Sequence, residues 1–277
     1  MTVRDILLQA NSHPEPTPEW AIERTARLAA TLGARASLGV CRVHIPPVAT
    51  WLANKLLDID GVIAGENRKS TTNQEAIAER FATLVPAEQR GDSFVIDCPG
   101  MVTPWQLAIR ARTHDLTILP VYGHPETVSV AEGLIFESGR PVLLLPEGGN
   151  SLDLKRITVA WDGSSVAART LAAAMPLCAK AGSVAVVQIT GEKDLSKGAP
   201  LADVIRNLSL HGISAEPVEV TVEEGDAAST LQSFCQRDGS ELLVMGAFGQ
   251  SRARQFVLGG VTRSVLRGPK LPILISH

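Results

Sequence analysis

The stretch Arg140-Pro-Val-Leu-Leu-Leu-Pro146 returns at the end of the chain as Leu271-Pro-Ile-Leu-Ile-Ser-His277. Each is a short aliphatic run that follows a proline, as expected of a buried strand in a parallel sheet. The opening strands of the two halves also align, with Asn11 opposite Asp162. The chain therefore contains an internal repeat of roughly 130 to 150 residues, which is too long for a solenoid unit and fits a duplicated domain.

Strands alternate with helices in both halves, which predicts an α/β fold with a mostly parallel sheet. In the first half we expect strands at 6–10, 36–43, 93–97, 116–119 and 141–145, and helices at 18–32, 66–84 and from 103 onward. In the second half we expect strands at 157–161, 184–189, 215–222, 242–245 and 272–275, and helices at 164–179, 200–211, 226–237 and from about 259. Thr17 is expected to cap the first helix and Gly33 to end it.

A linker separates the two halves. The segment Glu147-Gly-Gly-Asn-Ser151 has loop composition, and a length of 277 residues fits two domains of ordinary size. We place one domain at residues 1–147 and the second at residues 154–277.

Composition and charge exclude several classes of protein. The chain has 26 basic and 29 acidic residues, a net charge of −3, so no strong field favours nucleic acid. A basic cluster near the C-terminus has Phe256 as its one interleaved aromatic, and nucleic-acid binding is not expected there. The cluster comprises Arg252, Arg254, Arg263, Arg267 and Lys270.

The four cysteines are far apart and do not form a disulfide framework, so reduced thiols are expected. The N-terminus has no signal-peptide pattern, and no apolar run approaches the roughly 18 residues of a membrane span. A cytoplasmic protein without membrane contacts is the expectation. Cys41 and His44 have a CxxH spacing, but two ligands do not make a metal site.

Three features of the second half lie where an open parallel sheet binds ligands, at the carboxyl ends of strands. Asp162 follows the first strand, and its carboxylate is suited to a ribose or a base edge; alternatively it shapes the turn and caps the helix. Gly246-Ala-Phe-Gly249 follows the fourth strand and permits close approach of backbone amides to an anion. Gly259-Gly260 opens the last helix, whose N-terminus favours a phosphate.

With these segments, the second half resembles a universal stress protein (UspA-type) domain, a member of the adenine-nucleotide-binding α/β superfamily. The matching segments are Ile157-Thr-Val-Ala-Trp-Asp-Gly-Ser164, Glu224-Gly-Asp226, Leu242-Leu-Val-Met-Gly246 and Leu266-Arg-Gly-Pro-Lys-Leu-Pro-Ile-Leu-Ile275. ATP-binding members carry Gly, two residues, Gly, nine residues, then Gly followed by Ser or Thr. Gly246, Gly249 and Gly259 stand at those spacings.

The resemblance implies an adenine-nucleotide-hydrolase-like, Rossmann-like fold with five strands per domain in the order 3-2-1-4-5. It also implies ATP with Mg²⁺ as the ligand, with Asp162 at the ribose or adenine and Ile189 giving backbone contacts to the adenine. Gly246, Gly249 and Gly259 would line the phosphate path. Gly260 stands where the family has Ser or Thr, so one phosphate-binding hydroxyl is missing. Arg252, Arg254 and Arg263 are near enough to meet phosphates or to be ordinary solvated charges.

The first half departs further from the family pattern. Asn11 replaces the acidic residue, Pro120 stands opposite Gly246 and removes a backbone N–H, and Leu134 replaces the Ser or Thr. Gly123 and Gly133 keep the nine-residue spacing. We interpret the first domain as a degenerate, non-binding partner of the second.

In the family, domains pair through their last strands. We therefore expect residues 142–145 and 273–275 to join the halves as a pseudo-dimer within one chain, an arrangement compatible with a further homodimer. The implied function is a stress-response role through ATP binding in the C-terminal domain, with slow ATP hydrolysis at most. The alternative is an interaction protein in which both nucleotide sites have decayed.

Overall fold

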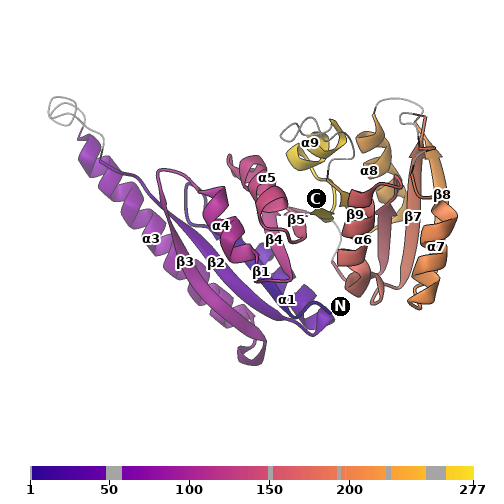
Figure 1. The fold of residues 1–277 in the computed structure, drawn as a ribbon. Helices are drawn as coiled ribbons and strands as arrows, with labels where there is room; N and C mark the ends of the chain where they lie inside the picture. The colour runs from indigo at the N-terminus through magenta and orange to yellow at the C-terminus, as the bar shows by residue number, and fades with distance from the viewer. Residues whose placement is uncertain are drawn as a thin grey trace.

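Within the described residues, ten strands form one sheet in the order β3-β2-β1-β4-β5-β10-β9-β6-β7-β8 (Figure 1). The computed structural model describes residues 2–47, 58–148, 152–191, 195–196, 198–222, 226–247 and 260–277. The strands of the first half are β1 (Asp5–Asn11), β2 (Arg35–His44), β3 (Arg90–Pro99), β4 (Leu116–Val121) and β5 (Val142–Pro146). Those of the second half are β6 (Arg156–Ala160), β7 (Ser183–Thr190), β8 (Ala215–Thr221), β9 (Leu242–Gly246) and β10 (Ile273–Ser276).

The predicted strand order 3-2-1-4-5 is confirmed in both halves, because the second half has the order β8-β7-β6-β9-β10. All neighbours within a half are parallel. In each half, the first three strands therefore follow one another in one direction across the sheet, and the fourth and fifth strands lie on the other side of the first. The first and fourth strands are neighbours. This is the topological switch point at which open α/β sheets bind ligands.

Helices cover both faces of the sheet. The first half contains α1 (Glu19–Leu32), α3 (Ile59–Leu84), the 3₁₀ helix η1 (Ala87–Gln89), α4 (Pro104–Ala111) and α5 (Thr127–Glu137). The second contains α6 (Ser165–Cys178), α7 (Leu201–Leu210), α8 (Ala227–Asp238) and α9 (Gly260–Arg267). One apolar core lies under α1, α3, α6 and α7, and the other under α4, α5, α8 and α9. Both cores extend across the two halves, so the halves share one three-layer structure.

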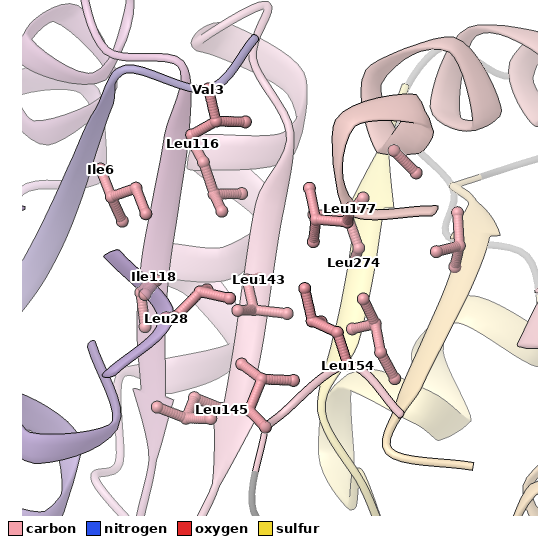
Figure 2. Close-up of a cluster of buried hydrophobic side chains, with 14 of the residues drawn as sticks. Val3, Ile6, Leu28, Leu116, Ile118, Leu143, Leu145, Leu154, Leu177 and Leu274 are labelled. Atoms are coloured by element: carbon pink, nitrogen blue, oxygen red, sulfur yellow. The ribbon is translucent and has the colours of Figure 1, made fainter. Parts of the chain in front are cut away.

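The halves are joined through their last strands, as predicted. β10 pairs antiparallel with β5, with Ile273 opposite Leu144 and Ile275 opposite Val142. Figure 2 shows the apolar side chains at this junction, where Leu143 of β5 faces Leu274 of β10. The pairing leaves neither last strand as an open edge, which removes a site of uncontrolled strand association.

Three local predictions need correction or extension. Thr17 does not cap α1: the helix begins at Glu19, and the Thr17 hydroxyl accepts a hydrogen bond from the Asn11 backbone N–H. α3 begins at Ile59, seven residues before the predicted start at 66. No helix was predicted for the residues that form α5. α5 is apolar on much of its surface, which hid the helical period. The predicted stop at Gly33 is confirmed by its left-handed backbone, with φ +64°.

Candidate nucleotide site

Three residues singled out in the sequence lie at the carboxyl ends of three neighbouring strands. β6 pairs with β7 so that Ala160 lies opposite Val187, and with β9 so that Val159 lies opposite Val244. Continuing those registers brings Asp162, Ile189 and Gly246 to nearly the same level of the sheet. Their meeting point is the switch point between β6 and β9.

The Asp162 carboxylate organises the turn after β6. Its Oδ1 accepts a hydrogen bond of 3.0 Å from the Ser164 backbone N–H, and the Ser164 hydroxyl accepts one of 3.1 Å from Ala167 N–H. Ser164 is therefore the N-cap of α6. Gly163 has φ +71°, a left-handed conformation that favours glycine. Asp162 thus has the local turn role that the sequence left open, and the capping role belongs to Ser164.

One face of this turn is covered by the chain that follows β7. Ala199 N–H donates a hydrogen bond of 3.0 Å to the Gly163 carbonyl, and the Trp161 indole N–H donates one of 2.9 Å to the Ala199 carbonyl. Trp161 belongs to the core under α6 and α7. Ala160 and Ile189 pack against the opposite core, and Asp162 continues the row of Ala160. Asp162 and Ile189, both half-buried, therefore lie on the face of α8 and α9.

Gly246 has a packing reason to be glycine. A Cβ at this position would lie 3.0 Å from the Ala167 backbone nitrogen and 3.1 Å from the Val166 carbonyl carbon. The absence of a side chain therefore lets the first turn of α6 approach the end of β9. The next residue, Ala247, is buried, and its N–H donates to the Ser276 carbonyl at 2.8 Å.

The remaining predicted phosphate contacts are described in part. Gly249 and Gly259 lie outside the described residues, as do Arg252 and Arg254. Gly260 is the first residue of α9, whose N-terminus follows the glycine segment. α6 also begins at this edge of the sheet, so two helix N-termini contribute partial positive charge there.

The corresponding position in the first domain is filled by the protein itself. The Asn11 side-chain oxygen accepts a hydrogen bond of 2.5 Å from the Gln9 amide, and Asn11 is 4% exposed. The Tyr122 hydroxyl lies 3.4 Å from the Thr17 hydroxyl and donates to the Glu15 carbonyl at 3.2 Å. Burial raises the pKa of Tyr122, which keeps the donor protonated. The segment between β1 and α1 therefore closes over this end of the sheet.

The glycines that keep the nine-residue spacing in the first half have a different role. Gly133 lies inside α5, where a Cβ would stand 2.5 Å from Pro104 Cβ, so it permits contact between α5 and α4. Leu134 is fully buried, and Pro120 lies within β4. None of these three offers a group to a phosphate.

Cys41 and His44 do not form a metal pair. Cys41 is buried in the core under α4 and α5, whereas His44, three residues further along β2, is exposed on the other face. A hydrogen bond with the Cys98 thiol, together with burial, raises the pKa of Cys41. Over the described ranges, no group of three or more His, Cys, Asp or Glu side chains is placed to hold a metal ion.

Two features were not predicted from the sequence: the contact of Tyr122 with the segment between β1 and α1, and a groove beside α3 lined by Arg42, Arg68 and Asp97. Tyr122 is the single tyrosine of the chain, but its position after β4 gave no indication of the loop it would contact. Among the described helices, none is both long enough and apolar enough to cross a membrane.

The fold and this site define a tandem α/β protein whose two domains share one sheet and differ in their switch points. Residues 153–277 match the model of the universal stress protein family. The second domain is therefore a universal stress protein domain, and the whole chain has the fold of a tandem protein of that type.

Solved structures support the tandem fold over the full length. A universal stress protein from Archaeoglobus fulgidus DSM 4304 is similar with a TM-score of 0.71 and 17% identity, covering 100% of this chain and 99% of that one. A candidate universal stress protein from Pseudomonas aeruginosa UCBPP-PA14 has a TM-score of 0.57 and 15% identity, covering 99% and 93%. At these identities the likeness shows the fold. The search of curated proteins found no match.

Proposed function

We propose that the second domain binds an adenine nucleotide, ATP with Mg²⁺, at the carboxyl ends of β6, β7 and β9. The observation that carries this proposal is the position of Asp162 beside Ile189 and Gly246 at the switch point of a universal stress protein domain. Ligands of open α/β sheets bind at this point. The first domain takes no nucleotide, since its own side chains fill the equivalent position.

The residues fit the parts of a nucleotide. The half-buried Asp162 carboxylate suits the hydroxyls of a ribose, and the end of β7 at Ile189 offers backbone groups to the adenine edge. The helix N-termini of α6 and α9 suit the phosphates, which would hold Mg²⁺ together with water. Gly246, Gly249, Gly259 and Gly260 are the proposed phosphate-binding positions.

Gly260 sets the affinity in this proposal. A hydroxyl there would give a charge-assisted hydrogen bond of about 1.5–3 kcal/mol, so its absence weakens binding by roughly tenfold to a hundredfold. Binding weaker than that of a site with this hydroxyl fits a regulatory role in which the protein responds to nucleotide concentration. We assign no nucleophile or general base, and therefore expect little or no hydrolysis.

The test is calorimetric titration of the full chain with Mg-ATP. Asp162→Asn keeps the oxygen that accepts the Ser164 N–H but removes the charge, so it separates ligand binding from the local turn. We expect saturable binding to the wild type, weaker binding to Asp162→Asn, and binding about tenfold or more tighter to Gly260→Ser.

Asn11→Asp, the matched change in the first domain, should leave ATP binding unchanged. No heat with the wild type and none with Gly260→Ser would contradict the proposal. That result would favour an interaction protein in which both sites have decayed.

A further inference from the structure

A hollow of the molecule lies in the first domain, between α3 and the carboxyl ends of β2 and β3. Its volume is about 700 Å³, within the range of small-molecule sites. Figure 1 shows α3 running alongside β2 and β3 at the outer end of the sheet. Charged and polar side chains line the groove together with the apolar parts of its walls: the strands provide Arg42, His44 and Asp97, and the helix provides Arg68, Thr71 and Thr72.

The groove exists because the apolar row of β2 stops early. On the side that faces α3, Ala36, Leu38 and Val40 are buried, and the next residues of that row are Arg42 and His44. α3 makes its apolar contacts further along, through Ile77 and Phe81. Where the apolar contacts end, helix and sheet leave space between them.

Hydrogen bonds hold the walls of the groove in place. Asn67 of α3 accepts from the Ile45 backbone N–H at 2.7 Å and donates to the Ile45 carbonyl at 3.0 Å. The Ser70 hydroxyl donates to the Val43 carbonyl at 2.7 Å. These bonds tie α3 to the end of β2, so the groove is part of the folded structure.

The charges of the groove favour an anion. Arg42 donates from Nε and Nη2 to Asp97 Oδ1, at 2.9 and 2.6 Å, which leaves its Nη1 for another partner. Over the described residues, the Arg68 guanidinium makes no hydrogen bond or ion pair. The lining of the groove thus includes two guanidinium groups, those of Arg42 and Arg68, and one carboxylate, that of Asp97. Guanidinium groups are the side chains best suited to paired contacts with phosphate or carboxylate oxygens.

This groove differs from the proposed nucleotide site in both domain and face. The residue of β2 equivalent to Ile189 is Cys41, because Ala36 lies opposite Ile6 as Val184 lies opposite Ile157. Cys41 points into the core under α4 and α5. Arg42 and the groove are on the other face of the sheet, beside α3.

We propose that this groove binds a small organic anion that carries at least two negative charges on phosphate or carboxylate oxygens. Arg68 is the main charged contact, and Arg42, held by Asp97, is the second. The hydroxyl of Thr72 adds a neutral donor. The site is independent of ATP binding in the second domain.

The test is a titration followed by the backbone amide signals of the full chain in NMR spectra. Pyrophosphate and citrate are the two probes, added separately at constant ionic strength, so that the arms distinguish a phosphate from a carboxylate ligand. We expect saturable shifts at Thr71 and Thr72 with one probe or both. Shifts confined to the second domain would report its own phosphate site and would count against the groove.

Charge variants then test the contacts. Arg68→Gln should weaken probe binding about tenfold or more, because one charged contact is lost. Asp97→Asn should strengthen it severalfold, because a neighbouring negative charge is removed. The matched control is Arg206→Gln, an arginine of α7 that is also exposed, pairs with Asp203 and lies outside the groove. No saturable shift at the groove with either probe, or an unchanged affinity in Arg68→Gln, would overturn the proposal.

Discussion

Asp162 and Asn11 stand at the same position of the two domains and have different surroundings. Asp162 accepts a backbone N–H in a tight turn and remains half-buried. Asn11 is almost fully buried, with its side chain bonded to Gln9 and its backbone N–H bonded to Thr17. At the scale of a residue, the difference between a candidate site and a closed one is therefore which neighbours the side chain has.

Leu154, just after the linker, is strained and buried at the same time. Its φ of +59° is in the left-handed region, which costs a non-glycine residue about 1–2 kcal/mol. Its side chain is fully buried in the core between the halves (Figure 2). The burial of a leucine offsets the strain.

This predicts an unusual order of stability at position 154. Leu154→Ala should lower the free energy of unfolding by about 2–5 kcal/mol through lost burial and a cavity. Leu154→Gly, although smaller, should be about 1 kcal/mol more stable than the alanine variant, because glycine adopts φ +59° without strain. Urea unfolding of the three proteins measures this order. A glycine variant less stable than the alanine variant would show that the strain is absent.

At the scale of elements, α6 and α8 of the second domain begin with side-chain caps, whereas α1, α3, α4 and α5 of the first domain do not. Ser164 caps α6 through its side chain, and α8 has a complete capping box formed by Asp226 and Ser229. Prolines precede α1 and α7, and neither of those helices has a side-chain cap. The caps fix where α6 and α8 start, and thereby fix the edge of the sheet that carries the candidate site.

We predict that Asp226→Ala destabilises the protein by about 0.5–2 kcal/mol at neutral pH, the usual cost of losing an N-cap. The Ser229 backbone N–H donates a hydrogen bond of 2.7 Å to Asp226 Oδ1, and this bond holds the pKa of the carboxyl below its ordinary value. A group with a lowered pKa contributes stability above its unfolded-state pKa and loses it as the pH falls through the folded-state pKa. The difference between wild type and variant should therefore shrink below about pH 4.

Thermal unfolding at pH 7 and pH 3 measures that difference. Asp226→Ser, which keeps a capping oxygen that does not titrate in this range, is the control and should show little change with pH. A constant difference between wild type and Asp226→Ala at both pH values would argue against a role for the carboxylate charge.

At the scale of the molecule, the central feature is that β5 and β10 turn two five-stranded sheets into one. β10 lies between β5 and β9, so Ile273, Leu274 and Ile275 each have a partner residue on both sides. One apolar core lies on each face of the sheet at this junction. We therefore expect the two halves to unfold together.

Leu274→Pro tests this coupling. Proline in a central strand removes a ladder hydrogen bond and is poorly tolerated there, so the variant should lose more stability than Leu274→Ala. The alanine change should cost about 2–5 kcal/mol through lost burial alone. Calorimetry should show one cooperative transition for the wild type and two separated transitions for the proline variant. A single transition at the wild-type temperature in Leu274→Pro would contradict the coupling.

Much of this fold could be predicted from local sequence patterns. Short aliphatic runs such as Ile157-Thr-Val-Ala are long enough for a buried strand and too short for most helices, and the glycines and prolines between them mark the ends. The resemblance to a family whose domains pair through their last strands predicted that residues 142–145 and 273–275 join the halves, which the register of β5 and β10 confirms. The residues that follow strands, Asp162 among them, could be predicted as a site because parallel strands bring their carboxyl ends to one edge.

Other features depended on contacts between distant segments. Gly246 was predicted as a phosphate-path position and Gly133 only keeps the glycine spacing of the first half; the structure shows in addition that both lie where a Cβ would meet another helix. Tyr122 closes the first domain against a loop more than 100 residues earlier in the chain. The sequence around Gly246, Gly133 and Tyr122 does not indicate these contacts, because they are set by the packing of distant helices and loops on the sheet.

The sequence by itself thus determined two α/β halves, since these follow from local hydrophobic period and a repeated pattern. The resemblance to universal stress proteins implied their strand order, and the carboxyl edge of each sheet was predicted as the place for a ligand. The tertiary structure decided that the first domain closes its own edge through Asn11 and Tyr122, and where α3 separates from β2 to leave a groove lined by charged side chains. The physical reason is that burial and close approach depend on what each residue meets across space: a side chain such as Tyr122 gains its partner, the Glu15 carbonyl, only when distant elements pack together.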